Sequence, residues 1–218
     1  MEDAKFPLVP FDEIGYQAVF SGQKTYNGVA IISRARPEDV TKDMVGYDDH
    51  QKRVIAATIN GVRVVCAYVP NGQTVESEKY QYKLNWLAAL QSYVRDTISA
   101  YGDVALLGDY NIAPEDRDVH DPKAWEGQVL CSVPERDAFR ALVALGLTDS
   151  FRLFEQPEKS FSWWDYRMNG FKRNLGLRID HILLTSDLAG RCTGSLIDVE
   201  PRKLDRPSDH APVVADIR

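Results

Sequence analysis

Residues 104–111 read VALLGDYN and form the most informative stretch of the chain. The four apolar residues 104–107 predict a short buried strand, which ends at Gly108 and leads directly into Asp109 and Asn111. Side chains two residues apart in an extended chain share one face, so these two polar groups are expected in one site. The alternative is an ordinary turn or helix cap, because Asp and Asn favour both.

The rest of the chain reads mostly as strands. A helix is expected from Ser77 to about residue 100, because apolar residues recur near the 3.6 period and Gly102 ends the run. A second helix is expected to open at a capping box, Ser132 with Glu135, and to close at Gly146. Two packed sheets with helices outside, an α+β arrangement, fit this order of elements. Strands are expected over residues 16–20, 29–34, 53–59, 62–69, 161–166, 178–185, 193–198 and 212–217, with an Asn60-Gly61 hairpin turn between the third and the fourth.

Length and composition favour a single domain that covers all 218 residues and buries its own core. The net charge of −6 argues against a protein that coats polyanions, although a local basic patch or a bound cation could still bind nucleic acid. No stretch approaches 18 apolar residues and the acidic start lacks the apolar centre of a secretory signal, so neither a membrane span nor export is expected. Three scattered cysteines without a CxxC pair indicate a reduced, cytoplasmic protein rather than a disulfide framework or a zinc knuckle.

Two further stretches place ionisable side chains beside strands. Residues 178–184 read RIDHILL, so Asp180 and His181 are neighbours within a strand and one of them must face inward. A buried Asp needs a partner, because its unpaired burial costs several kcal/mol. Residues 207–212 read PSDHAP and place Asp209 and His210 in the loop before the last strand. A solvated edge strand and a capping turn are the respective alternatives.

Taken together, these stretches supply carboxylates, an amide and a histidine. That set is typical of metal-assisted phosphoryl transfer, and its oxygen ligands favour Mg²⁺ or Mn²⁺ over zinc. No glycine-rich Walker loop and no Gly-x-Ser-x-Gly motif occur, so the sequence indicates neither nucleoside triphosphate use nor an acyl-transfer serine. The other histidines, His50, His120 and His181, are expected to be structural or exposed.

In this order and spacing the motifs resemble the endonuclease/exonuclease/phosphatase superfamily, and within it the exonuclease III group of abasic-site endonucleases and 3′-to-5′ exonucleases. The resemblance covers essentially the whole chain. It implies a four-layered α/β/β/α sandwich with two mixed, largely antiparallel sheets. It also implies a monomeric, Mg²⁺-dependent DNA-repair nuclease that cleaves double-stranded DNA at abasic sites and 3′ ends by in-line attack of water. The motifs that carry it are YNGVA (26–30), YVPNG (68–72), GDYN (108–111), RDVHDP (117–122), FSWWDY (161–166), RIDH (178–181) and SDHAP (208–212).

The resemblance assigns roles at the reacting phosphate. Asp209 is similar to the metal-binding carboxylate of the family. Asp109 matches the group that orients or deprotonates the attacking water, and Asn111 matches the one that stabilises the charged transition state. If two ions bind, Asp109, Asn111 and His210 are further ligand candidates.

Three more positions match catalytic residues of the family. His210 resembles the imidazole that acts as a base or polarises the phosphate, and Asp180 resembles the carboxylate that orients it. That pairing would give the inward-facing Asp180 its partner. Tyr68 resembles the tyrosine beside the scissile phosphate.

The resemblance also implies contacts with DNA. Trp163 and Leu177 match an apolar pocket for a flipped, base-less sugar, which excludes normal nucleotides by size; a core tryptophan is the alternative reading. The basic stretch that begins at Arg167 could cross a phosphate backbone, although a solvated hairpin tip fits it as well. Tyr26 and Asn71 match positions that contact the backbone without reading sequence.

The chain departs from the family pattern at its start. Members begin with a β-α-β unit that carries Trp-Asn and Gln-Glu, and its Asn and Glu belong to the metal site. We expect this chain to lack that unit of about thirty to forty residues. Lower metal affinity, a lower rate and exposed strand edges are the expected consequences.

Two other functions stay open from the sequence. One is a superfamily phosphatase or phosphodiesterase that acts on inositol or lipid phosphates. The pocket position of Trp163, the stretch 118–122 and the lack of a membrane-docking segment argue against it. The other is a non-catalytic DNA-binding remnant, which the missing unit favours and the retained Asp109, Asn111, Asp180 and His210 disfavour.

Overall fold

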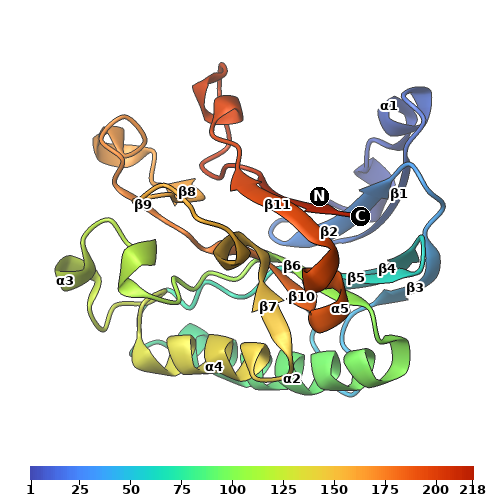
Figure 1. Cartoon of the computed structure of the whole chain (residues 1–218), viewed down its shortest axis with the longest axis horizontal. Helices are drawn as coiled ribbons and strands as arrows, with labels where there is room; N and C mark the ends of the chain where they lie inside the picture. The colour runs from blue at the N-terminus through green and yellow to red at the C-terminus, as the bar shows by residue number, and fades with distance from the viewer.

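The computed structural model describes all 218 residues, and a six-stranded sheet forms its centre (Figure 1). Every neighbouring pair of strands in this sheet is antiparallel except β5 and β6, which run parallel. Apolar runs with β-branched residues explain the central strands, because such residues pack well on a pleated surface. The strand order is β3 (Glu38–Lys42), β4 (Val54–Ile59), β5 (Val62–Ala67), β6 (Val104–Asp109), β10 (Asp180–Thr185) and β7 (Leu147–Asp149).

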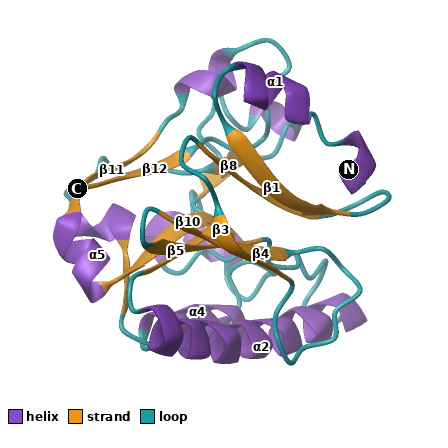
Figure 2. Cartoon of the chain, turned by 90° about the vertical axis from the view of Figure 1, so that its right-hand side faces the viewer, coloured by secondary structure: helices purple, strands orange, loops and turns teal.

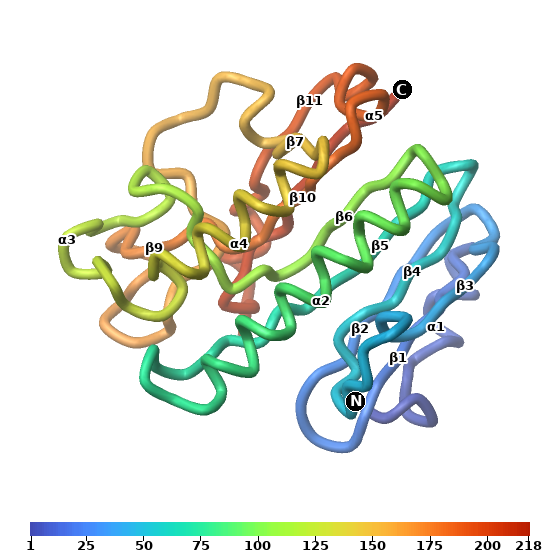
Figure 3. The backbone as a smooth tube through the Cα atoms, turned by 90° about the horizontal axis from the view of Figure 1, so that it is seen from below, coloured from blue at the N-terminus to red at the C-terminus, as the bar shows by residue number.

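Two long helices, α2 (Glu78–Tyr101) and α4 (Val133–Val143), cover one face of this sheet (Figure 3). The side chain of Ser77 caps α2 by accepting from the Tyr80 amide. The predicted capping box of Ser132 and Glu135 is confirmed at the start of α4. Fully buried side chains such as Trp86 on α2 and Leu106 on β6 belong to the largest apolar core, which lies between the helices and the sheet.

The opposite face of the sheet is covered by a second layer of strands (Figure 2). This layer consists of two separate antiparallel pairs, β1 (Gln17–Gly22) with β2 (Gly28–Ser33) and β11 (Cys192–Ile197) with β12 (Val213–Ile217). Strand β4 shows how the two layers are joined. Its residues 54 and 56 belong to the helix-side core, whereas 55 and 57 pack with β2. The layered α+β arrangement predicted from the sequence is confirmed.

The predicted hairpin turn is confirmed as well. Asn60 and Gly61 both have positive φ, 49° and 83°, as a two-residue turn of the I′ type requires. Ile59 and Val62 pair directly across the turn.

Several short elements were not expected from the sequence. The strand expected over residues 161–166 is reduced to β8 (Trp163–Trp164), which pairs with β9 (Gly176–Leu177). Elements of two to six residues have too few positions for a periodic pattern to stand out. The others are α1 (Leu8–Glu13), α3 (Pro122–Trp125), α5 (Ser186–Arg191), β3 and β7, with 3₁₀ turns at Asp3–Lys5, Asp116–Asp118, Ser150–Leu153, Arg167–Asn169 and Glu200–Lys203.

Two simpler expectations concern the whole chain. None of the helices is both long enough and apolar enough to span a membrane. The three cysteines, Cys66, Cys131 and Cys192, are all free. The fold is therefore held by packing and hydrogen bonds rather than by cross-links.

The ends of the central strands converge at one edge of the sheet. Strands β5 and β6 end there, and the antiparallel β10 begins there with Asp180 directly opposite Asp109. Gly108 makes this edge possible, because a Cβ at this position would lie 2.0 Å from the carbonyl oxygen of Ala67. Its φ of 140° is also one that L side chains rarely adopt.

We predict that Gly108→Ala destabilises the protein by more than about 3 kcal/mol, because the added methyl group collides with backbone that cannot move aside. Urea unfolding followed by circular dichroism measures the change. Gly190→Ala in α5 is the matched control, since a Cβ there meets nothing within 4 Å, and it should change stability by less than about 1 kcal/mol. Equal effects of both substitutions would contradict the close-approach argument.

Candidate active site

The three polar stretches predicted from the sequence meet at the converging strand ends. They line a cavity of about 410 Å³. β6 ends at Asp109, β10 begins at Asp180, and the loop before β12 brings Asp209 and His210 over them. The predicted residues that line this cavity are Tyr68, Asn71, Asp109, Asn111, Trp163, Arg167, Asp209 and His210.

Asp109 and Asn111 form one hydrogen-bonded unit. The backbone N–H of Asn111 donates to Asp109 Oδ1 at 2.8 Å. The side-chain Nδ2 of Asn111 donates to Asp109 Oδ2 and to the Val69 carbonyl, each at 3.0 Å. Asn71 Nδ2 donates to Asn111 Oδ1 at 3.0 Å. Asn111 has φ of 49°, which Asn tolerates better than most residues. The orientation of its amide group is therefore fixed on every side.

His210 and Asp180 form the second unit. His210 Nδ1 lies 2.9 Å from Asp180 Oδ2, which also accepts from Ser162 Oγ at 2.6 Å. Burial alone would lower the pKa of His210, but the hydrogen bond and charge of Asp180, with smaller effects from Asp109 and Asp209, raise it to about 9. The imidazole is thus held by its Nδ1 edge, and Ser162, not expected from the sequence, holds its carboxylate partner.

Asp209 is fixed by the tryptophan strand β8. Trp163 Nε1 donates to Asp209 Oδ2 at 3.0 Å, and the Trp164 amide donates to the Asp209 carbonyl at 3.0 Å. A single β-bridge between Trp163 and His210 ties the same segments together. The loop that carries Asp209 and His210 is therefore held in place by backbone as well as by side-chain bonds.

Negative charge is concentrated around Asp109. Burial raises the pKa of its carboxyl group, and the neighbouring charge of Asp180 raises it further. Burial and the charge of Asp109 also raise the pKa of the Tyr68 phenol, which stays neutral near pH 7. A cation beside Asp109 would relieve this repulsion.

The carboxylates of Asp109 and Asp209 are the side chains best suited to hold such a cation. No group of three or more His, Cys, Asp or Glu side chains is close enough to bind an ion without further ligands. Mg²⁺ commonly uses only one or two protein carboxylates and completes its shell with water and substrate phosphates. The donor set therefore fits a hard dication of this kind. The side-chain oxygen of Asn111, a further ligand candidate from the sequence, already accepts a hydrogen bond from Asn71.

An apolar wall closes the cavity on one side. Trp163 and Ile179 line it together with Trp125, Val129 and Leu130 from the segment around α3. Leu177 has no exposed surface and packs behind this wall, so it does not line the cavity. Trp125 escaped the sequence analysis, although Asp121-Pro122 was a usable signal: Asp121 caps α3 by accepting from the Ala124 amide.

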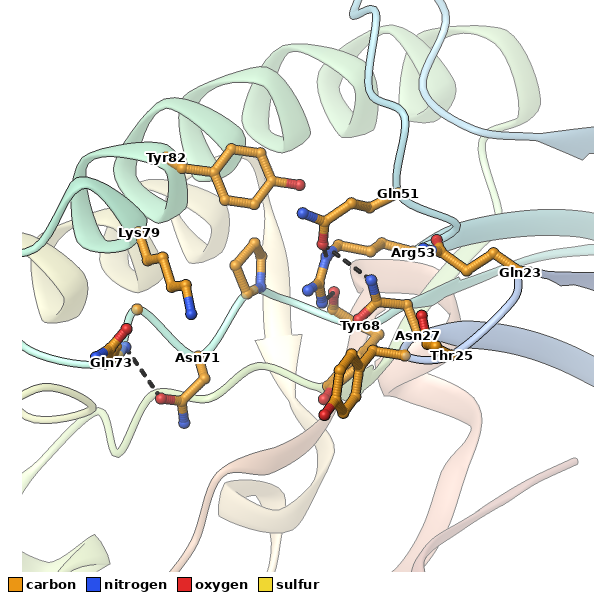
Figure 4. Close-up of a pocket in the computed structure, with 13 residues that line it drawn as sticks. Gln23, Thr25, Asn27, Gln51, Arg53, Tyr68, Asn71, Gln73, Lys79 and Tyr82 are labelled. Atoms are coloured by element: carbon orange, nitrogen blue, oxygen red, sulfur yellow. Dashed lines mark hydrogen bonds between the residues drawn. The ribbon is translucent and has the colours of Figure 1, made fainter.

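A second cavity of about 630 Å³ adjoins the first and shares Tyr68 and Asn71 with it (Figure 4). Its lining is mostly polar and includes the loop with Tyr26, which is 82% exposed. Arg53 and Lys79 contribute the positive charge of this cavity and form no ion pair with a carboxylate. The sequence analysis did not single out either of them. Arg167, in contrast, is exposed and paired with Asp165 at 2.7 Å.

His181 lies behind the site and is structural, as expected. Its Nε2 donates to the Ile112 carbonyl at 3.0 Å, and its Nδ1 accepts from Arg178 at 3.0 Å. Burial and the charge of Arg178 lower its pKa to about 3, so the ring is neutral in the folded protein. Arg178 in turn bonds Asp118 and Asp149 at 2.6 and 2.8 Å. His50 is exposed, and His120 Nδ1 lies 3.1 Å from the Gly176 carbonyl.

The chain belongs to the Endonuclease/Exonuclease/phosphatase family, whose model matches residues 2–210. It is 35% identical to the exodeoxyribonuclease III of Haemophilus influenzae over 99% of this chain and 86% of that protein. Its fold is similar to that of the 3′ phosphatase NExo from Neisseria bound to product DNA hairpin, with a TM-score of 0.98 and 47% identity. An AP endonuclease from Archaeoglobus fulgidus is similar with a TM-score of 0.95 and 41% identity. Both structural matches cover 100% of this chain and 85% of the other.

We predict that His181 makes the protein lose stability as the pH falls. In the unfolded chain its pKa is about 6.5, so below that pH only the unfolded state takes up the proton. Between pH 7 and 5 this linkage lowers the free energy of unfolding by about 2 kcal/mol, a loss that His181→Gln should remove. Urea unfolding of both proteins at the two pH values measures it. An identical pH dependence in the variant would contradict a neutral His181.

Proposed function

We propose that this protein is a DNA-repair nuclease that hydrolyses phosphodiester bonds at abasic sites and 3′ ends with the help of Mg²⁺ or Mn²⁺. One observation carries the proposal: a carboxylate pair, an imidazole held by a carboxylate, and a fixed amide line one cavity with an aromatic wall. The exodeoxyribonuclease III and AP endonuclease names of the relatives support it. We further propose that the protein acts as a monomer.

In the proposed reaction, water attacks the phosphorus in line with the departing 3′ oxygen. Asp109 orients this water and takes the proton that it loses during the attack, and the departing 3′ oxygen gains a proton from solvent. The His210 imidazole offers a hydrogen bond to the phosphate oxygens, where negative charge grows in the transition state, and Asn111 Nδ2 joins it by exchanging its bond to Asp109 for one to the phosphate. Asp180 holds His210 through Nδ1, so the other ring nitrogen is left for the substrate. The bound dication, held by Asp209 and Asp109, would act as a Lewis acid on the phosphate.

The two cavities suit one strand of DNA. The apolar wall of Trp163, Trp125 and Ile179 can take a base-less sugar, since a damaged nucleotide costs the least to flip out of the duplex and a normal nucleotide is excluded by size. The polar cavity with Arg53, Lys79 and Tyr26 can take neighbouring backbone phosphates. Leu177 supports the wall from behind.

The proposal is tested by incubating the protein with Mg²⁺ and three substrates: an abasic-site duplex, a duplex with a 3′ phosphate, and a phosphoinositide. We expect cleavage of the DNA substrates and none of the phosphoinositide, because nothing in the site selects an inositol ring. Excess EDTA should abolish the cleavage. Turnover of the phosphoinositide alone would refute the assignment to DNA.

Asp209→Ala should lower kcat on the abasic-site duplex at least about 100-fold, because the ion loses a carboxylate at the reacting phosphate. Gel-based nicking at saturating DNA measures the effect. Asp205→Ala is the matched control: Asp205 is exposed in the same loop and does not line the cavity, so its variant should retain full activity. Normal nicking by Asp209→Ala would show that the metal assignment is wrong.

A further inference from the structure

A fully buried ion pair lies outside the site, between the two long helices and the loops of the site. Lys83 on α2 and Glu135 on α4 have no exposed side-chain surface, and Lys83 Nζ lies 2.5 Å from Glu135 Oε1. The other partners of Nζ are the carbonyl oxygens of Asn111 at 2.6 Å and Asn71 at 3.1 Å. An ammonium group has three donors, and all three are used here. Since burying an ion pair seldom adds net stability, the pair calls for another explanation.

The two carbonyl groups belong to residues whose side chains line the site. Asn71 and Asn111 are also joined to each other by the 3.0 Å bond between their amide groups. Lys83 therefore fixes the backbone of Asn71 and Asn111 on the core side, whereas their side chains meet on the cavity side. Gly72 leaves room for this, because a Cβ there would lie 3.2 Å from Lys83 Cδ.

Glu135 extends the same contacts to the apolar wall. Its Oε1 also accepts from the Leu130 amide at 3.0 Å, and its Oε2 accepts from the Ser132 amide at 3.1 Å. Leu130 and its neighbour Val129 line the cavity. One buried pair thus touches three separate loops that surround the proposed reacting phosphate.

We propose that Lys83 and Glu135 are positioning residues, which set the distance between the Asn71, Asn111 and Leu130 loops without touching the substrate. The catalytic part of this inference rests on the proposed nuclease function. The structural part, that the pair holds the two asparagines in register, stands on the contacts alone. A pair that served only stability would leave the turnover of the folded protein unchanged.

The test uses the double variant Lys83→Met/Glu135→Gln. It removes both charges and nearly preserves the volume, whereas either single change would leave an unpaired buried charge and risk unfolding. Arg63→Met is the matched control. Arg63 is also a buried cation, 2% exposed, and it bonds the Asp39 carbonyl, but it sits at the opposite end of β5 from the site.

On the abasic-site duplex with Mg²⁺, well below the unfolding temperature, the double variant should lose about 100-fold in kcat, because a displacement of about 1 Å at reacting groups costs that much. KM should change far less, since Asn111 acts in the transition state. The control should keep its kcat even if its stability falls. Unchanged kcat in the double variant, or an equal loss in the control, would overturn a catalytic role for the pair.

A second measurement does not depend on activity. In ¹⁵N NMR spectra of the metal-free, DNA-free protein, the side-chain amide signals of Asn71 and Asn111 report their mutual bond. We expect their hydrogen exchange to become at least about tenfold faster in the double variant and to stay unchanged in Arg63→Met. Unchanged exchange in the double variant would overturn the positioning role. If the unaltered protein cleaves no DNA, the proposed function fails, and the exchange comparison still decides whether the pair positions the asparagines.

Discussion

The pairing of β6 with β10 is the constraint on which the site depends. It sets Asp180 directly opposite Asp109, at the point where both strands reach the edge of the sheet. A slip of one residue would turn every side chain of β10 to the other face of the sheet. It would move Asp180 away from His210 and carry the buried His181 into the site. The register that builds the core between Leu106 and Leu183 is therefore the same register that assembles the proposed chemistry.

The two carboxylates differ in how their charge is compensated. Asp180 faces the His210 imidazole and the Ser162 hydroxyl, so its charge has partners within the protein. Asp109 has only amide donors from Asn111, and its pKa is raised by burial and by Asp180. Asp180 thus binds the histidine, whereas the charge of Asp109 is not balanced by a cationic partner. This difference supports the roles proposed above, in which Asp180 orients the histidine and Asp109 faces the water and the dication.

Much of this arrangement could be predicted from the sequence, because at these positions the local sequence preferences agree with the tertiary structure. The apolar run before Asp109, the Asn60-Gly61 turn and the capping box at Ser132 each have a local physical cause, and each is present. What escaped prediction depends on distant partners. Asp121-Pro122 indicates a helix start before Trp125 but does not show that Trp125 lines the cavity with Trp163. Leu177 has the same sequence pattern whether it lines a pocket or supports it from behind. Likewise, Lys83 reads as an ordinary helix surface residue until the fold buries it against Glu135.

The segment after β6 explains why three hydrogen-bond-donating side chains lie behind the site. Residues 111–113 have left the sheet, so their carbonyl groups have lost the strand partners that buried backbone requires. Each carbonyl instead accepts from a buried or half-buried side chain: Lys83 bonds residue 111, His181 bonds residue 112, and Arg136 bonds residue 113. Three side chains from three different elements thus provide the hydrogen bonds that a neighbouring strand provides elsewhere in the sheet. A segment held in this way can keep Asn111 in its left-handed conformation while its front stays open to a substrate.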